Sequence, residues 1–515
     1  MISTPSARSR WLARKPIVAV QRDATSHGLK RVLGPVNLAL LGVGCTIGAG
    51  IYVMPGNAAA NFAGPAVMLA FLLAGFGCVF IALCYAELCA VMPVSGSAYT
   101  YCYAALGEVF AWGLGWLLLF EFGLSCSMLA VGFSGYFASL LHDLGWAIPV
   151  GLRTSLVEAV PTPHGISFVV GGGINLVAAL GVLAAMIVLI VGVSASASVN
   201  NLLVAIKVIV LLAFIVAGLG SIRPQNWTPF VPPNEGGFAF GWPGIIRAAS
   251  ILFYAFMGFE TVATAASEAR NPQKDMPIGI LCALFACTIL YVVAAAVLTG
   301  IVPYRELGIP DPIALAVDRI GHPRFALFVK SGALAGLSSV LLAVMYGQTR
   351  IAFAMSRDGL LPPLFSRLNR KFRTPLWGTV LLGTATLLGA ALLPLTLLAD
   401  LVSLGSSSAF LTVSISLMWL RSTQPHLQRP FSVPLGGFWV GRAWIGYVPA
   451  AAVVFCLAMI VPVVMDIIGQ ALRGQPIPAL ILGIYALAGI AIYHGYGVRR
   501  SVLARAGDLT LGGAP

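Results

Sequence analysis

The chain has 515 residues, of which 59% are hydrophobic and only 9% are charged, and its mean hydropathy is +0.94. Soluble domains carry about 25% charged residues, so this composition excludes an ordinary soluble domain and predicts a polytopic membrane protein. The formal net charge of +13 does not indicate nucleic-acid binding, because Lys and Arg cluster in short segments between apolar stretches, as orientation signals do.

Uninterrupted apolar stretches of about 20 residues predict transmembrane helices, and the sequence contains twelve such stretches. We expect helices at 36–60, 65–92, 107–141, 171–192, 199–220, 243–267, 276–302, 324–355, 376–394, 399–420, 444–466 and 477–497. With the N-terminus inside, inner segments hold 21 of the 30 Lys and Arg residues and outer segments hold eight. This bias predicts that both termini are cytoplasmic, in a multi-pass protein of the cell (inner) membrane.

The first predicted helix contains an unusual stretch, "LGVGCTIGAGIYVMPG", which carries five glycines and ends in proline. Each glycine costs a helix interior roughly 1 kcal/mol relative to alanine. One interpretation is close helix packing, because small residues let backbones approach one another in lipid. The other interpretation is that the helix opens here and exposes its backbone.

The sixth predicted helix has a similar glycine, Gly258 in "FYAFMGFET", five helices after the first. Because five is odd, a second five-helix unit would lie inverted relative to the first. Glycine-interrupted helices at matching places in two inverted halves indicate a transporter's binding site at the membrane midplane. Exposed N–H and C=O groups would suit a zwitterion, so the pattern favours an α-amino acid as ligand.

We single out four ionisable residues within or near the ends of predicted helices, because such groups inside a membrane are functional candidates by default. Lys207 is about eight residues into helix five, roughly 12 Å deep, and snorkelling to the surface is the alternative. Glu121 and Glu260 are either functional or structural, hydrogen-bonded to neighbouring helices. Glu87 lies near the cytoplasmic end of helix two, where it favours an interface or gate role over ligand binding.

Other chemistries have little support in the sequence. It contains no GxxxxGK[ST] for a nucleotide-driven motor and no HExxH or GxSxG motif of a hydrolase. All six histidines fall in tails, loops or helix ends, and nearly all nine cysteines fall inside apolar stretches. We therefore expect no enzyme activity, no metal site, no cofactor and no disulfide framework.

Four segments resemble the amino acid–polyamine–organocation superfamily, and within it the bacterial members of the cationic amino acid transporter branch. They are "LGVGCTIGAGIYVMPG", "YAELCAVMPVSGSAYTYCYAALGE", "FYAFMGFETVATAASEARNPQKDMPIGI" and "YGQTRIAFAMSRDGLLP". The resemblance runs from about residue 30 to 500. It implies an all-α polytopic LeuT-type fold, with two inverted five-helix repeats and two further C-terminal helices. It also implies amino acid uptake by proton coupling or exchange.

The resemblance also implies roles for individual residues. The N–H groups of Gly48, Ala49 and Gly50 would bind the substrate carboxylate. The ammonium would be bound by the carbonyls of Thr46, Phe253, Tyr254 and Met257. Lys207 would fill the space of the ion in sodium-coupled relatives, with Glu121 as a second proton-coupling residue. Glu260 stands where bacterial relatives commonly have Asp, which leaves its role open.

The resulting domain division is a cytoplasmic tail (1–33), a ten-helix transport core (34–420), two additional helices with their preceding loop (421–498) and a second cytoplasmic tail (499–515).

Val344, on the eighth helix, is expected to line the side-chain pocket, and both it and Met257 are apolar. This favours neutral amino acids over Arg, Lys or ornithine. A channel and a non-transporting amino acid sensor remain open alternatives for the function. Membrane lipid is an expected partner, and a small accessory membrane subunit remains an open one.

Overall fold

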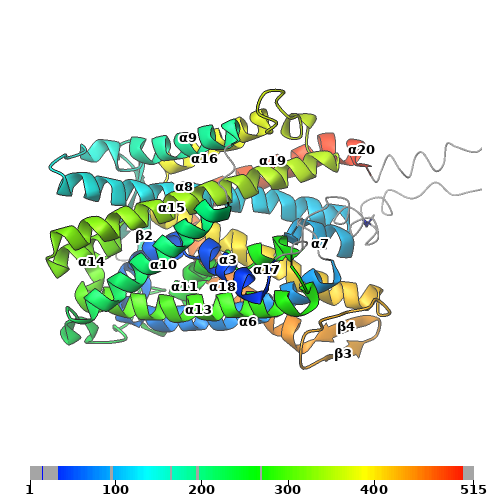
Figure 1. The fold of residues 1–515 in the computed structure, drawn as a ribbon, viewed down its shortest axis with the longest axis horizontal. Helices are drawn as coiled ribbons and strands as arrows, with labels where there is room; N and C mark the ends of the chain where they lie inside the picture. The colour runs from blue at the N-terminus through cyan, green and yellow to red at the C-terminus, as the bar shows by residue number, and fades with distance from the viewer. Residues whose placement is uncertain are drawn as a thin grey trace, which may run out of the picture.

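The structure is a computed structural model that describes residues 14–15, 33–92, 97–162, 165–192, 197–266 and 269–502. Its long helices lie side by side along the longest axis of the molecule (Figure 1). Most of the two predicted tails, 1–33 and 499–515, lies outside the described residues.

Helices make up most of the described chain. The first half contains α3 (Pro35–Thr46), α4 (Ala49–Tyr52), α5 (Met54–Ala58), α6 (Val67–Val91), α7 (Ser97–Ala105), α8 (Glu108–Asp143), α9 (Leu176–Val191) and α10 (Ala197–Leu219). The second half contains α11 (Gly241–Leu252), α12 (Thr261–Thr264), α13 (Pro272–Ile301), α14 (Pro312–Ile320), α15 (Pro323–Arg357), α16 (Leu376–Leu392), α17 (Leu395–Thr423), α18 (Tyr447–Leu472), α19 (Ile477–Ile492) and α20 (Val498–Arg500).

Nine helical stretches in the described part of the chain are long and apolar enough to cross a membrane. Three shorter apolar helices, α3, α9 and α16, accompany them. Each of the twelve predicted segments contains a helix. The protein is therefore a mostly helical, multi-pass membrane protein.

Two small antiparallel hairpins depart from the all-helical expectation. Strand β1 (Val157–Thr162) pairs with β2 (Gly165–Val170), and β3 (Gly437–Val440) pairs with β4 (Ala443–Gly446). The helix expected from residue 171 begins only at Leu176, because three glycines follow β2 and the Asn175 side chain then accepts from the N–H of Ala178. The helix expected from 444 begins at Tyr447, since the preceding residues pair in β4.

Helix α8 lies in the middle of the bundle and packs against α15, α16, α17 and α9. The first helix, α3, packs against α13, α10 and α12. Helix α6 lies between α13, α11 and α18. These contacts hold the interrupted segments of the first and sixth predicted helices against each other in the interior.

Two buried basic residues of the bundle are paired with carboxylates, as charges in apolar surroundings favour. Arg247 of α11 is fully buried and bonds to Asp400 of α17 at 2.7 Å and to Asp466 of α18 at 3.1 Å. Lys330 of α15 bonds to Asp143 and Asp318. Each cluster ties together helices that are far apart in the sequence.

Candidate functional site

The first predicted helix opens at the point that its glycines indicated. Helix α3 ends at Thr46, and the following Ile47 is extended, with φ −71° and ψ 99°. Gly48 has φ −156° and ψ −134°, and helix α4 begins at Ala49. The prediction that this helix is interrupted rather than continuous is confirmed.

The sixth predicted helix is interrupted as well. Helix α11 ends at Leu252 and is followed by a single 3₁₀ turn, Phe253–Phe256. Met257 then leaves the helical region with ψ 128°, and Gly258 has φ +128°, a backbone conformation that favours glycine. Helicity resumes at Thr261, in α12.

The two interruptions contact each other through their glycines. A Cβ atom on Gly258 would lie 2.6 Å from the backbone nitrogen of Thr46. A Cβ atom on Gly50 would lie 2.6 Å from the Cα atom of Ala255. Both interpretations of the glycines are therefore correct, because these positions permit the helices to open and also permit the opened segments to pack closely.

A cavity of about 90 Å³ lies between the two interruptions and helices α8 and α15. Seven of the eight residues expected to bind substrate line it, namely Thr46, Gly48, Ala49, Gly50, Tyr254, Met257 and Val344. The eighth, Phe253, is not among the lining residues, and its fully buried ring packs against Phe410 and Phe455. The structure thus brings almost the whole predicted set to one place.

The opened backbone of the first interruption presents free donors. Within the described part of the chain, the N–H groups of Gly48, Ala49 and Gly50 donate to no protein acceptor. Each such group would cost several kcal/mol in hydrocarbon without a partner. Their position on the cavity wall therefore creates a site for an anionic or strongly accepting group.

The expected acceptors are in part already engaged. The Thr46 carbonyl accepts from the Tyr291 hydroxyl at 2.7 Å, and the Tyr254 carbonyl accepts from the N–H of Met257 at 2.8 Å. A carbonyl oxygen has two lone pairs, so each of the two retains capacity for one more donor.

Lys207 joins helix α10 to the interrupted segment. It is only 3% exposed, and its Nζ donates to the Gly44 carbonyl of α3 at 3.0 Å. The hydroxyl of Tyr52, in α4, donates to the Lys207 carbonyl at 3.1 Å. The snorkelling alternative is wrong, because the ammonium group bonds inside the bundle, next to the first interruption.

Glu121 lies at the interface of α8 and α17 and does not line the cavity. Its Oε1 accepts from the Ser406 hydroxyl, while its Oε2 is buried and has no partner among the described residues. This hydrogen bond to a neighbouring helix agrees with the structural alternative, and the second oxygen leaves room for a proton.

Glu260 lies in the second interruption and lines the cavity. Its Oε2 accepts from the N–H of Gly258 at 2.8 Å, so the side chain binds the backbone of its own opened turn. The carboxylate is therefore both a structural support of the interruption and a part of the cavity wall.

Sequence reasoning missed several lining residues. Val340, Ala343 and Gly347 line the cavity together with Val344, and Phe122 and Cys45 complete this side. The other three α15 residues follow Val340 by three, four and seven positions, which places all four on one helix face. That spacing was available in the sequence once Val344 had been chosen.

Comparison with known proteins identifies the family of the chain. Residues 33–487 match a family model described as "Amino acid permease". The chain belongs to the amino acid permease family. This confirms the resemblance to the amino acid–polyamine–organocation superfamily that the motifs indicated.

Proteins named for different substrates are similar to the chain. It is 40% identical to a methylthioribose transporter of Bacillus subtilis (strain 168), over 83% of the chain and 89% of the relative. It is 39% identical to the branched-chain amino acid permease BcaP of the same organism, over 92% of the chain and 95% of the relative. It is 35% identical to the vacuolar cationic amino acid transporter 4 of Arabidopsis thaliana, over 78% of the chain and 64% of the relative. Similarity to permeases thus extends over most of the chain, but the relatives' names differ in substrate.

Proposed function

We propose that this permease is a secondary active transporter that moves L-amino acids across the membrane through the cavity between its two interruptions. The observation that carries the proposal is the set of unpartnered N–H groups at Gly48, Ala49 and Gly50 on the cavity wall. They would bind the substrate carboxylate, aided by the positive end of the adjoining helical segment. The carbonyls of Thr46, Phe253, Tyr254 and Met257 would accept from the ammonium.

The proposed membrane arrangement is the LeuT-type one. Ten helices within 34–420 would form two inverted five-helix repeats, and two further helices within 421–498 would complete twelve spans. The two interrupted helices lie five spans apart, as inverted repeats require. The bias of Lys and Arg supports cytoplasmic termini, and we propose the inner membrane as the location of the protein.

We favour neutral substrates with an apolar side chain. The residues that line the cavity include the apolar side chains of Val340, Val344, Met257 and Phe122. The relatives named for branched-chain amino acids and for methylthioribose have ligands with a compact apolar group. Cationic substrates are the alternative, and Glu260 on the cavity wall is the observation that favours them.

The proposed coupling ion is the proton. The Lys207 ammonium donates to the Gly44 carbonyl between α10 and α3, and by the family resemblance it would fill the space of the ion in sodium-coupled relatives. Two unit charges 4 Å apart at an effective dielectric of 20 repel by about 4 kcal/mol. This lowers sodium affinity roughly a thousandfold. Glu121, with one unpartnered oxygen, would be the second proton-coupling residue.

Uptake of the twenty radiolabelled amino acids into proteoliposomes tests the proposal, with radiolabelled methylthioribose as an additional substrate. We expect accumulation of branched-chain and other neutral amino acids. No uptake, together with retained binding, would indicate a sensor, and uptake of methylthioribose without uptake of any amino acid would contradict the amino acid assignment.

The same assay tests the side-chain pocket. Val344→Ser should enlarge the cavity and raise the uptake of longer or cationic amino acids relative to neutral ones. Val454→Ser on α18, where the valine is exposed, is the matched control. An unchanged rank order in Val344→Ser would remove this residue from substrate selection.

A further inference from the structure

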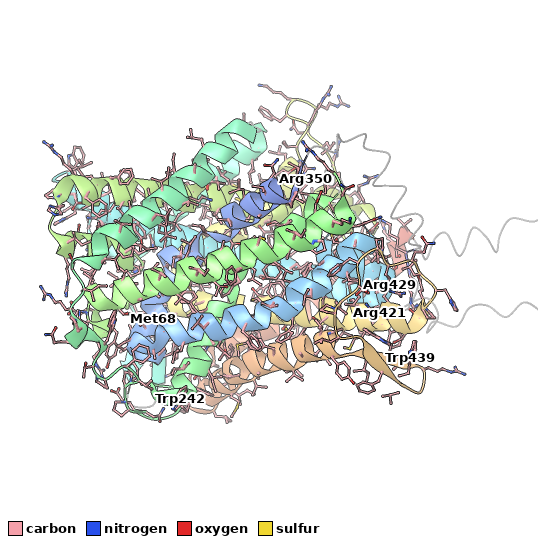
Figure 2. All side chains as sticks on the ribbon, turned by 60° about the horizontal axis from the view of Figure 1, so that its bottom comes forward. Met68, Trp242, Arg350, Arg421, Arg429 and Trp439 are labelled. Carbon is pink, nitrogen blue, oxygen red and sulfur yellow. The ribbon has the colours of Figure 1, made fainter. Side chains whose placement is uncertain are left out.

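The β3–β4 hairpin exposes apolar side chains at the end of the bundle where α20 also lies (Figure 1). Phe438, Trp439 and Val440 of β3 are 45%, 53% and 55% exposed, and Leu435 before them is 77% exposed. Figure 2 shows Trp439 on the periphery, beyond Arg421 and Arg429. All four residues of β3 are exposed, so both faces of this strand retain exposed side chains.

An isolated two-stranded hairpin is at best marginally stable in water, even with good pairing. Exposed apolar patches of this kind mark contact with another protein or with a membrane. The hairpin is nevertheless held in one register, from Gly437 opposite Gly446 to Val440 opposite Ala443. The apolar side chains of β3 that remain exposed are therefore available to a surface outside the chain.

The chain connections place the hairpin at the level of the membrane surface. Helix α17 ends at Thr423, and α18 begins at Tyr447, directly after β4. The Phe438 ring lies 5.7 Å from the Tyr447 ring, so β3 packs on the first residue of a membrane-spanning helix. Tyr447 is itself 55% exposed. Trp and Tyr are enriched at this boundary between water and lipid.

The charge of the connecting segment fits a phospholipid surface. Residues 424–446 contain Arg429 and Arg442 and no acidic residue. Arg442 is exposed in the turn between the two strands, next to the apolar residues of β3. A basic residue close to an anionic leaflet contributes about 1 kcal/mol of attraction. A second protein copy would meet the same positive charge on its own hairpin, which disfavours a symmetric contact.

The hairpin is also connected to the helix ends beneath it. The Arg421 guanidinium lies over the buried Trp444 of β4, 4.1 Å from the centroid of the tryptophan ring. The backbone N–H of Trp444 donates to the Ser422 hydroxyl. Arg421 in turn donates to Glu87 of α6 at 2.7 Å, and Glu87 is fully buried. These contacts connect the hairpin to α17 directly and to α6 through Arg421.

We propose that the β3–β4 hairpin is a membrane-surface anchor whose Phe438, Trp439 and Val440 enter the headgroup region while Arg442 binds anionic phospholipid. Such interfacial segments insert about 5–10 Å into the boundary of headgroups and acyl chains. Under the proposed topology this is the cytoplasmic leaflet. The anchor itself depends only on the membrane embedding of the permease, so it can hold even if the proposed substrate is wrong.

Nitroxide labels in reconstituted full-length protein test the depth of the hairpin. One label replaces Trp439 as Trp439→Cys, and the control label is Lys371→Cys, on the exposed loop between α15 and α16 at the same end of the bundle. Both are built with the exposed Cys282 replaced by Ser, and the spectrum of that parent is subtracted. Vesicles consist of phosphatidylcholine with or without phosphatidylglycerol.

The label at 439 should collide more with lipid-soluble oxygen than with a water-soluble nickel chelate, and the label at 371 should show the reverse. Equal water access at both positions would overturn the anchor. Shielding of the 439 label from both reagents, with dipolar broadening between labels, would show a second copy on the hairpin instead and would also overturn it.

The lipid charge is tested in the same vesicles. The protein labelled at Trp439→Cys, with Arg442 intact, should show a larger oxygen-to-nickel collision ratio at 439 with phosphatidylglycerol than without it. This difference should be lost when Arg442→Gln is added to the labelled protein and retained when Arg473→Gln is added, which removes a charge beyond the other end of α18. A difference that persists with Arg442→Gln, or that is absent from the labelled protein with Arg442 intact, would overturn the anionic-lipid contact.

Discussion

At the scale of single residues, Gly50 occupies one of the two tightest contacts between the interruptions. Replacing it by Val should abolish substrate binding, because the added Cβ would lie 2.6 Å from the Ala255 backbone and would crowd the N–H donors. Gly113→Val is the matched control, since a Cβ at Gly113 of α8 would meet nothing within 4 Å. Substrate-induced thermal stabilisation in detergent measures binding in both variants. Normal affinity in a folded Gly50→Val protein would contradict the proposed site.

Asp311, in the loop before α14, gives a second prediction at this scale. Burial raises the pKa of its carboxyl to about 6, against the opposing effect of Lys330. The folded protein thus binds this proton more tightly than the unfolded chain does. The contribution of Asp311 to the free energy of unfolding therefore falls as the pH rises from about 4 to about 6.

Asp311→Asn should remove that contribution, so its melting temperature should depend less on pH across this range than that of the wild type. Thermal unfolding of both proteins at a series of pH values in detergent provides the measurement. Parallel pH profiles for the two proteins would refute the assignment.

At the scale of helices, the buried Arg247 joins α11 to α17 and α18. Removing one partner of a buried ion pair typically costs about 3–5 kcal/mol, because the remaining charge stays buried. Asp400 has a side chain that is 9% exposed, and that of Asp466 is 20% exposed. Asp400→Asn should therefore lower the thermal midpoint more than Asp466→Asn does. The opposite order would show that Asp466 is the principal partner.

The interruptions of the first and sixth helices were predictable from the sequence, because glycine has a local conformational signature. Their offset of five helices, an odd number, predicts that the two interrupted helices have opposite orientations. The partners of Arg247 were not predictable, since that ion pair forms only when helices far apart in the chain come together. The hairpins were missed for a different reason. Strands β3 and β4 have four residues each, which is too few for a periodic pattern. Strand β4 also continues directly into the apolar helix α18.

At the scale of the whole molecule, the bond between Lys207 and Gly44 predicts transport driven by protons or by exchange, without sodium. Lys207→Met keeps much of the side-chain volume but removes the ammonium, so it should leave a folded protein with little or no uptake. Uptake into liposomes is measured with an imposed pH gradient and then with a sodium gradient at matched pH. Accumulation driven by sodium alone would falsify the coupling, and full activity of Lys207→Met would exclude this residue from it.

The central claim is that the opened backbone of one interruption binds the substrate carboxylate while the other interruption binds the ammonium. Displacement of the best radiolabelled substrate tests it most directly, with three competitors that share one side chain: the amino acid, its methyl ester and the corresponding amine without a carboxylate. Hydrogen bonds to charged groups contribute about 1.5–3 kcal/mol each, so losing the carboxylate should weaken binding by at least tenfold. We expect the free amino acid to displace the label far better than either analogue. Equal displacement by the ester and the amino acid would contradict the account.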